Sequence, residues 1–360
     1  MNRPTTTTRV SLPCAFLRPL WLKIFLMLLL TFALASTIAC AKGISSAGAT
    51  APAPKSESPA TTPAPPEAAP PDSSPLPHID SNPLPHIDSK RAFQYTREVT
   101  AFGPRYMGSE NHKKLEHYIL DHLKGDQVED DAFAADTVAG KFPVRNIIAK
   151  FPGTKDGIIV ILGHYDTVYP LRNSGFVGAN DGGSSTAILL EYANQVRGGG
   201  AGKKRDGYSV WLVWTDGEEA VRQWTDTDSV YGARHLAEKW EKDGTLKRIK
   251  ALVVMDMIAD ADLDIVRNTK GAPWLLDLIY AAAERGGYQS HFYAQQGPIE
   301  DDHVPFFNRG VPTADVIDLD YGYNNVFWHS PQDTMDKLSP KSLEIVGDTI
   351  LETIHLLDQR

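Results

Sequence analysis

The chain has 360 residues, of which 42% are hydrophobic, and its formal net charge is −9. This length and apolar content are enough for one sizeable core. The negative balance, without a basic stripe, excludes a nucleic acid held by its phosphates. The two cysteines, Cys14 and Cys40, both precede the folded part, so a zinc ion there would have to be held by His, Asp and Glu.

Residues 1–40 have the pattern of an export signal. Basic residues from Arg3 to Lys23 precede an apolar run, Ile24 to Ala35, that is shorter than the roughly 20 residues needed to span a bilayer. The residues before Cys40 resemble a bacterial lipoprotein signal, in which the cysteine becomes the lipidated first residue. We predict an exported protein of the cell envelope with a lipid anchor at Cys40. Plain secretion and an uncleaved anchor are the alternatives.

Residues 41–89 are predicted to form a disordered tether. They are rich in Pro, Ala, Ser and Thr, and such a composition cannot bury enough apolar surface to offset the entropy of ordering. The tether contains a duplicated "PLPHIDS", at residues 75–81 and 83–89, whose histidines His78 and His86 are expected to be solvated. The folded domain is expected over residues 90–360.

The folded part predicts an α/β fold with a mixed, mostly parallel central sheet covered by helices on both faces. Continuous apolar runs typical of buried strands begin near Asn146, Gly157, Tyr208, Ala251 and Val311. Helical spacing of apolar residues occurs before, between and after them, over residues 91–105, 109–125, 184–196, 229–242, 273–285 and after Pro340. Ser109 and Ser339 are the expected N-caps of two of these helices. Strands that alternate with helices in this way are typical of doubly covered sheets.

Residues that can bind a metal follow several of the predicted strands. In open α/β sheets, ligands bind outside the carboxyl ends of the strands. The residues found at these positions or in the adjoining turns are His164, Asp166, Asp181, Glu218, Glu219, Asp256 and His329. Their recurrence at one rim of the inferred sheet predicts a metal site there.

A catalytic zinc site needs three protein ligands and one open position. Asp181, Glu219 and His329 meet that need from three separate loops. Glu218, next to a ligand but pointing elsewhere, would be free to act as an acid and base beside the polarised group. This arrangement explains why the chain has two adjacent glutamates at the end of an apolar strand.

The order of these residues resembles that in the zinc aminopeptidase-like exopeptidase fold. It is carried by "HYDT" at His164, "NDGGSS", "DGEE", "MD" and "WH" at Trp328. Two longer segments, "DGEEAVRQWTDTDSVYGARHLA" and "EDDHVPFFNRGVP", resemble the animal-type glutaminyl-peptide cyclotransferases. The resemblance extends from about Arg91 to the end of the chain.

The resemblance implies an enzyme with one zinc ion per chain, held by the three ligands named above. Glu218 would be the proton shuttle, and Asp256 and Asp301 would form an acidic hydrogen-bonded pair beside it. Trp224 and Trp328 would wall the pocket of an N-terminal glutamine side chain. The implied reaction converts the N-terminal Gln of a peptide into pyroglutamate and releases ammonia. Peptides or proteins that begin with Gln would be the partners, and the chain is expected to be a monomer.

A zinc aminopeptidase that hydrolyses N-terminal residues is the alternative function. In that case His164 and Asp166 would be ligands of a second metal, whereas in a cyclase they would support a single zinc site by hydrogen bonds, and Asp256 has the same two possible roles. His303 either orients an acid or caps the helix that begins near Val304. The Trp after "DGEE" and the "EDDH" segment favour the cyclase.

The sequence departs from the animal enzymes in three respects. It has no cysteine pair for their disulfide near the active site. Gly182 follows Asp181 where Ser, Thr or Ala is expected. The loop "DLDYGYNNVFWH", which ends at His329, differs from a Pro-rich one, and the peptide preference that it shapes is therefore not implied by the resemblance.

Overall fold

The computed structural model describes residues 83–197 and 203–360. The predicted export signal, the lipid anchor at Cys40 and most of the predicted tether, including His78, lie outside these residues. Within the described ranges, no helix is both long and apolar enough to cross a bilayer.

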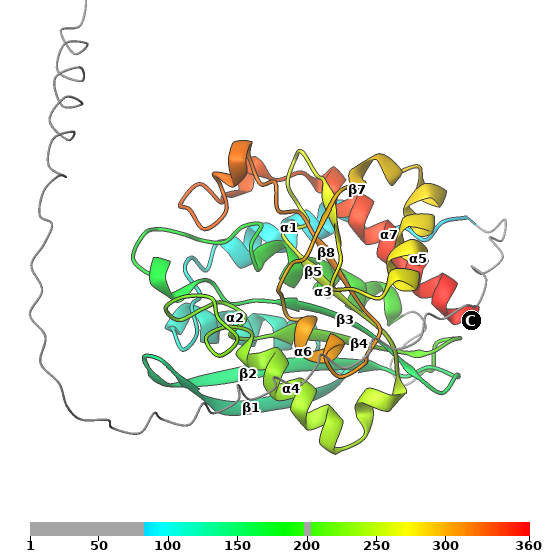
Figure 1. The fold of residues 1–360 in the computed structure, drawn as a ribbon, viewed down its shortest axis with the longest axis horizontal. Coiled ribbons are helices and arrows are strands. Elements are labelled where there is room, and N and C mark those ends of the chain that lie inside the picture. Colours follow the sequence, from blue (N-terminus) through cyan, green and yellow to red (C-terminus); the bar gives the residue numbers. More distant parts are fainter. Residues whose placement is uncertain (1–82, 198–202) are drawn as a thin grey trace, which may run out of the picture. The chain divides into compact units, whose positions relative to one another are not determined.

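A central sheet of six strands forms the middle layer of the domain (Figure 1). The strands lie in the order β1 (Gln127–Thr137), β2 (Gly140–Phe151), β4 (Ser209–Thr215), β3 (Ile158–His164), β5 (Ile249–Asp256) and β8 (Thr313–Ile317). The pairs β4–β3, β3–β5 and β5–β8 are parallel, whereas β1–β2 and β2–β4 are antiparallel. The sheet is thus mixed, and its parallel half carries the loops predicted to bear the site.

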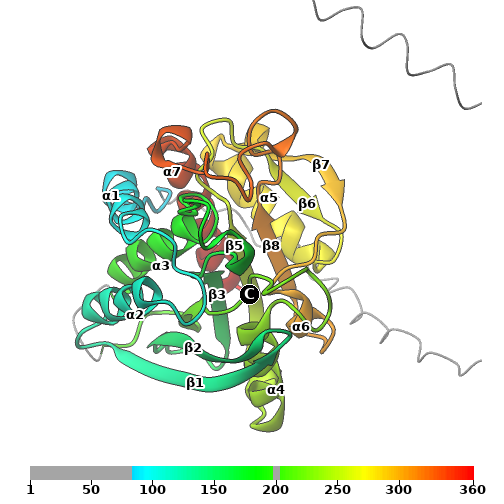
Figure 2. The same ribbon diagram turned by 90° about the vertical axis from the view of Figure 1, so that its left-hand side faces the viewer.

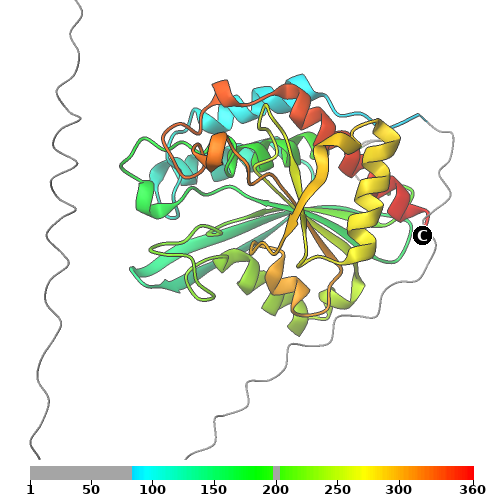
Figure 3. The same cartoon turned by 45° about the horizontal axis from the view of Figure 1, so that its top comes forward.

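Helices cover both faces of this sheet (Figures 1 and 3). One face packs against α1 (Ser89–Thr100), α2 (Glu110–His122), α3 (Gly183–Val196), α5 (Pro273–Gly286) and α7 (Pro340–Asp358). The other packs against α4 (Tyr231–Lys242) and the short α6 (Val304–Phe307). The predicted α/β architecture is confirmed.

Smaller elements complete the described part. Strands β6 (Ile265–Asn268) and β7 (Phe292–Gly297) form a separate parallel pair beside β8 (Figure 2). The 3-10 turns are η1 (Tyr169–Leu171), η2 (Thr245–Arg248), η3 (Gln289–His291), η4 (Tyr323–Asn325) and η5 (Met335–Lys337).

The apolar run of β3 is continuous because the strand is buried on both faces. Ile159 and Ile161 belong to the larger core under α1, α3, α5 and α7. Ile158, Val160 and Leu162 belong to the core under α4 and α6. Alternate side chains of a strand point to opposite faces, so both must be apolar when helices cover both sides.

The sequence pattern identifies six of the helices and five strands of the central sheet. Ser109 and Ser339 cap α2 and α7 as predicted, since their side chains accept from the His112 and Lys341 N–H groups. The pattern misses β1, β6 and β7, whereas the short helix expected near Val304 is present as α6. Strand β1 is missed because it is an edge strand with the acidic sequence "QVEDDAFAADT", and its acids are matched by Arg145, Lys150 and Lys239 across the fold.

The packed part of the chain begins earlier than predicted. Composition assigns residues up to Ser89 to the tether, but Ile87 is buried and the Asp88 side chain caps α1. The His86 ring lies 2.7 Å from the Asp348 carboxylate while most of its surface is exposed. The last residues of the second "PLPHIDS" copy therefore pack against α7, a contact that composition could not indicate.

The first turn of α4 lies against the loop after β4 at unusually short range. A Cβ atom on Gly232 would lie 2.3 Å from the Asn146 side-chain oxygen and 2.4 Å from the Asp216 carbonyl oxygen. The Gly232 N–H donates to that Asp216 carbonyl at 3.0 Å. This contact fixes the position of the "DGEE" segment relative to α4.

Gly232→Ala is expected to destabilise the protein by about 1–3 kcal/mol, because the added methyl forces the loop and helix apart. Urea unfolding followed by circular dichroism measures this loss. Gly297→Ala is the matched control, since its Cβ would meet nothing within 4 Å. Equal stability of the two variants would contradict the assigned contact.

Candidate active site

The rim of the parallel strands opens into a cavity of about 590 Å³. It is lined by most of the residues that the sequence singled out, namely Asp181, Glu218, Glu219, Trp224, Asp256, Asp301, Trp328 and His329. The three residues predicted to support the site, His164, Asp166 and His303, are buried behind it. Side chains that lie far apart in the sequence therefore meet at one place.

Asp181, Glu219 and His329 converge at the floor of this cavity. Each offers one ligand atom, and these atoms lie within 4.8 Å of one another. His329 Nε2 is 3.2 Å from Glu219 Oε1 and 3.4 Å from Asp181 Oδ2. Asp181 Oδ2 is buried and has no hydrogen-bond partner among residues 83–197 and 203–360. A buried carboxylate oxygen without a donor, facing an imidazole and a second carboxylate, fits a divalent cation such as zinc.

The turn that presents Asp181 explains the departure at Gly182. Gly182 has φ of 71°, a left-handed conformation that glycine adopts without strain. A Cβ there would lie 2.7 Å from the Asp166 carbonyl oxygen and 3.0 Å from the His164 ring. The close approach of the turn to β3 therefore requires glycine after Asp181.

Buried polar side chains that the sequence analysis missed also hold this turn. Arg105 is fully buried and donates to the Gly178 carbonyl at 2.8 Å and to the Asp181 carbonyl at 3.3 Å. On the other side, the Asp333 carboxylate accepts from the N–H groups of Asn180 and Asp181, at 2.8 and 3.2 Å. The sequence analysis assigned no role to Arg105 or Asp333, since each lies in an irregular segment far from its partners.

One carboxylate orients both glutamates of the "DGEE" segment. Asp166 Oδ1 accepts from the Glu218 N–H at 3.2 Å, and Asp166 Oδ2 accepts from the Glu219 N–H at 3.4 Å. Glu219 then faces His329, while Glu218 Oε2 lies 3.8 Å from His164 Nδ1. Asp166 therefore contacts the backbone of the pair, in keeping with a supporting position.

A buried acidic cluster surrounds Glu218. Burial raises the pKa of Glu218 well above its usual value. The charge of His164 opposes this rise, whereas the charges of nearby carboxylates increase it, namely those of Glu219, Asp301 and Asp302. Burial likewise raises the pKa of Asp301 well above its usual range, and the charge of Asp315 raises it further. Acids held this close cannot all be ionised, so the cluster holds protons near neutral pH.

His164 lies between two carboxylates, with its Nε2 3.1 Å from Asp256 Oδ1 and 3.3 Å from Asp181 Oδ1. These three residues form a second group whose ligand atoms lie within 4.8 Å of one another. The group shares Asp181 with the first one. The geometry therefore contains the ligand sets of both the one-metal and the two-metal alternatives.

His303 faces the acidic cluster rather than the helix that follows it. Its side chain makes no cap hydrogen bond to α6. The Asn268 side chain donates to its Nε2 at 3.4 Å, and its Nδ1 lies 3.7 Å from Asp315 Oδ2. Burial lowers the pKa of His303 to about 3, so the ring is neutral at physiological pH. Among the described residues, His303 thus neither caps α6 nor forms a hydrogen bond to an acid through Nδ1.

Two tryptophans stand at the mouth of the cavity. The Trp328 ring stacks on His329 with centroids 4.2 Å apart, and Trp224 lies on the loop after the glutamates. They remain 42% and 38% exposed, respectively, which is high for such large apolar side chains. Exposed aromatic surface at a cavity mouth is typical of a binding site.

Comparison with known proteins assigns the chain to a family. Residues 146–354 match the model of peptidase family M28. The glutaminyl-peptide cyclotransferase of Drosophila melanogaster is 32% identical over 255 residues, which cover 64% of this chain and 70% of that protein. The chain belongs to the glutaminyl-peptide cyclotransferases, within peptidase family M28.

Solved glutaminyl cyclases have the same fold. The enzyme of an Acidobacteriales bacterium is 46% identical, with a TM-score of 0.75 over 79% of this chain and 99% of that one. That of Porphyromonas gingivalis is 26% identical, with a TM-score of 0.67 over 75% and 98% of the two chains. The resemblance that the sequence suggested is confirmed at the level of the glutaminyl-peptide cyclotransferase family.

A third group of ionisable residues supports the "DGEE" segment from behind. His112 is buried, with Nε2 2.7 Å from Asp216 Oδ1 and Nδ1 3.1 Å from Glu116 Oε1. The Arg145 N–H also donates to Asp216, at 2.8 Å. Since carboxylates occupy both nitrogens of His112, we interpret this group as an ion-pair triad that anchors the first residue of the segment.

The His112 triad predicts a pH dependence of stability. Burial lowers the pKa of His112, but the charges of Asp216 and Glu116 outweigh it and raise the pKa to about 10. Burial by itself raises the pKa of Asp216, and the His112 charge opposes that rise. His112 therefore stabilises the fold fully below its unfolded pKa of about 6.5, and this contribution is lost as the pH rises toward 10.

Urea unfolding at pH 6, 8 and 10 measures the free energy of unfolding. In the wild type this free energy should fall by up to about 1.4 kcal/mol per pH unit above neutrality, and His112→Gln should abolish this fall. His122→Gln is the control, because that ring hydrogen-bonds to the Tyr118 carbonyl of its own helix and forms no ion pair with the described residues. If the slope with pH were the same in wild type and His112→Gln, the triad would not hold the proton assigned to it.

Proposed function

We propose that the chain converts the N-terminal glutamine of peptides into pyroglutamate and releases ammonia. The observation that carries this proposal is the position of Glu218, a free carboxyl group beside a three-residue ligand cluster in an aromatic-mouthed cavity. The family membership supports the same reaction. The glutamine side chain and the α-amine of one residue must then meet inside this cavity.

We propose zinc as the cofactor, one ion per chain, held by Asp181, Glu219 and His329. Their donor set of two carboxylates and one imidazole suits zinc, and the partnerless Asp181 oxygen supports this choice. When bound, zinc would supply a Lewis acid that polarises the γ-carbonyl group of the substrate glutamine.

The chain's own residues would position and move the proton. Glu218 accepts a proton from the α-amine as that amine attacks the γ-carbonyl carbon, and returns it to the departing ammonia. Asp256 and Asp301 line the same cavity as Glu218. The described residues show Asp256 hydrogen-bonded to His164 at 3.1 Å and no hydrogen bond between Asp256 and Asp301. His164, Asp166 and His303 act indirectly, through hydrogen bonds and packing behind the site.

Orientation contributes the rest of the rate enhancement. Nucleophile and electrophile belong to the same residue, so holding the side chain in a ring-closing conformation removes most of the entropic cost. Trp224 and Trp328 provide apolar walls for that side chain and limit the entry of water. Water is a competing nucleophile that would produce glutamate in place of the ring.

A zinc aminopeptidase is the second candidate, and the His164, Asp181 and Asp256 group is the observation that favours it. Hydrolysis by a two-metal site needs a second ion at this group. In the cyclase, the same His164 and Asp256 contact is a hydrogen bond that orients Asp256. The number of metal ions per chain distinguishes the two functions.

We further propose that residues 1–40 direct export and that Cys40 carries a lipid anchor. Residues 41–82 would then act as a tether between the envelope membrane and the catalytic domain. Substrates would be exported peptides or proteins that begin with Gln, and the domain would act as a monomer. The sequence pattern of the leader supports the export step.

The reaction is tested by incubating the protein with Gln-Ala and Leu-Ala amides. We expect pyroglutamyl-Ala amide and ammonia from the first and no free leucine from the second. Glu218→Gln should retain its metal and fold but lose about 10²- to 10⁴-fold in kcat, because the proton transfer is lost. Ammonia release by this variant at the wild-type rate would remove the shuttle role, and free leucine would favour the aminopeptidase.

His329→Ala should lower zinc occupancy, since it removes one of three ligands. Plasma mass spectrometry of the purified protein measures zinc per chain, and about one equivalent is expected in the wild type. His117→Ala is the control, because His117 is exposed on α2 and bonds within its own helix. Full occupancy in His329→Ala would show that the wrong ligand was chosen, and two equivalents in the wild type would favour the peptidase.

A further inference from the structure

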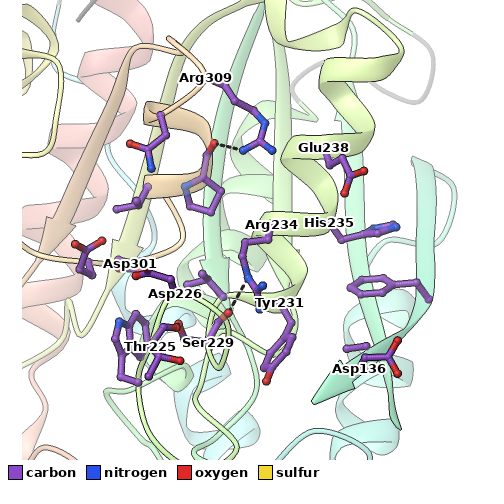
Figure 4. Close-up of a pocket in the computed structure, with 18 of the residues that line it drawn as sticks. Asp136, Thr225, Asp226, Ser229, Tyr231, Arg234, His235, Glu238, Asp301 and Arg309 are labelled. Atoms are coloured by element: carbon purple, nitrogen blue, oxygen red, sulfur yellow. Dashed lines mark hydrogen bonds between the residues drawn. The ribbon is translucent and has the colours of Figure 1, made fainter. Parts of the chain in front are cut away.

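A second cavity of about 520 Å³ adjoins the catalytic one. Figure 4 shows the residues that line this second cavity. Both cavities are lined by Trp224, Glu300 and Asp301, which therefore form a shared wall. The second cavity lies between the Trp224–Ser229 loop, the start of α4, strand β1 and the segment around α6. None of the steps in the proposed reaction uses it.

Arg234 projects from α4 into this cavity (Figure 4). Its Nε donates to the Ser229 carbonyl at 3.1 Å and its Nη2 to the Thr227 carbonyl at 3.2 Å. The guanidinium carbon lies 4.8 Å from the Tyr231 ring centroid. Within the described residues Arg234 forms no ion pair, although it is half-buried and burial lowers its pKa.

Most of the other charges that line the cavity already have partners or are buried. Asp136, Glu238 and Glu300 each pair with a lysine, and Arg309 pairs with Glu241 at 3.0 Å. Asp301 is buried, and its pKa is raised. Asp226 is exposed and acts on Arg234 only through its charge. Arg234 is thus a half-buried cation that, among the described residues, lacks a counter-ion in contact.

We propose that this second cavity receives the residues that follow the N-terminal glutamine and that Arg234 binds a carboxylate that they carry. The inference rests on the proposed function, because a peptide whose first residue occupies the catalytic cavity must continue past its wall. A guanidinium with a free edge over an aromatic ring is suited to bind a planar carboxylate. The carboxylate can come from an acidic side chain or from the C-terminus of a short peptide.

A set of peptide amides identifies the position after glutamine at which a carboxylate is preferred. Gln-Ala-Ala-Ala amide is compared with the three peptides that carry Glu in place of one alanine, and with their Lys counterparts. We expect one Glu peptide to exceed the neutral one in kcat/KM by about three- to tenfold, and the matching Lys peptide to fall below it. Free-acid forms of Gln-Ala and Gln-Ala-Ala identify a C-terminal carboxylate as the source. Equal kcat/KM for all peptides would overturn the proposal.

Variants assign the effect to Arg234. Arg234→Gln, which can still bond to the loop carbonyls, should abolish the acidic advantage and leave kcat/KM for the neutral peptide close to the wild-type value. Arg309→Gln is the matched control, because it removes a paired arginine of the same cavity. Asp226→Asn should increase the acidic advantage, since it removes an opposing charge at the surface. An unchanged advantage in Arg234→Gln would contradict the assignment.

Two measurements keep the test decisive. If Arg234→Gln does not fold, two other results test the charge of Arg234. Asp226→Asn should still increase the preference for the Glu peptide, and the wild-type preference should be lost as salt rises from about 0.05 to 0.5 M. If no peptide is turned over, the proposed function is wrong. Calorimetric binding of the Glu and Lys peptides then tests Arg234 separately, and equal affinities would overturn this inference as well.

Discussion

The site depends on two hydrogen bonds, which the Asp166 carboxylate accepts from the consecutive backbone N–H groups of Glu218 and Glu219. They fix the backbone of Glu218 and Glu219, and because successive side chains diverge, Glu219 turns to Asp181 and His329 while Glu218 turns to the acidic cluster. Asp166 itself is fixed by its position just after β3, one of the central strands of the sheet. The Asp166 carboxylate thus places the neighbouring side chains of Glu218 and Glu219 in different surroundings.

Around this constraint the protein buries more charge than a core normally contains. The buried acids Asp181, Glu218, Glu219, Asp301, Asp302 and Asp315 each carry a desolvation cost. Three features reduce this cost in the structure. Neutral donors satisfy some of the carboxylate oxygens, since Asn268 donates to Asp315 at 2.8 Å and the Thr215 hydroxyl donates to Asp302. The raised pKa of Asp302 and Asp315, about 7 for each, allows protons to be shared, and a cation would neutralise the Asp181 cluster.

Trp224 lines both cavities, and under the proposed function the two cavities would give a bound peptide a direction. The apolar cavity would enclose the reacting residue, and the polar one would contact the rest of the peptide. The same loop that carries Trp224 is fixed by Asp228, whose carboxylate accepts from three consecutive N–H groups, those of Val221, Arg222 and Gln223. A wall fixed in this way would let the first residue of the peptide be enclosed while the sequence of the following residues varies.

The sequence by itself determined the element types and the inventory of the rim. Continuous apolar runs and helical spacing depend only on local composition, and the position of ligand-type residues after strands reflects where parallel strands end. Only the tertiary structure decided which residues hold the site in place. Arg105, His112 and Asp333 have partners that are 60 or more residues away in most cases, so their roles exist only once the sheet brings those segments together. The same holds for Arg234, which has no counter-ion in contact among the described residues. This is a property of the folded surface that the amino-acid sequence does not show.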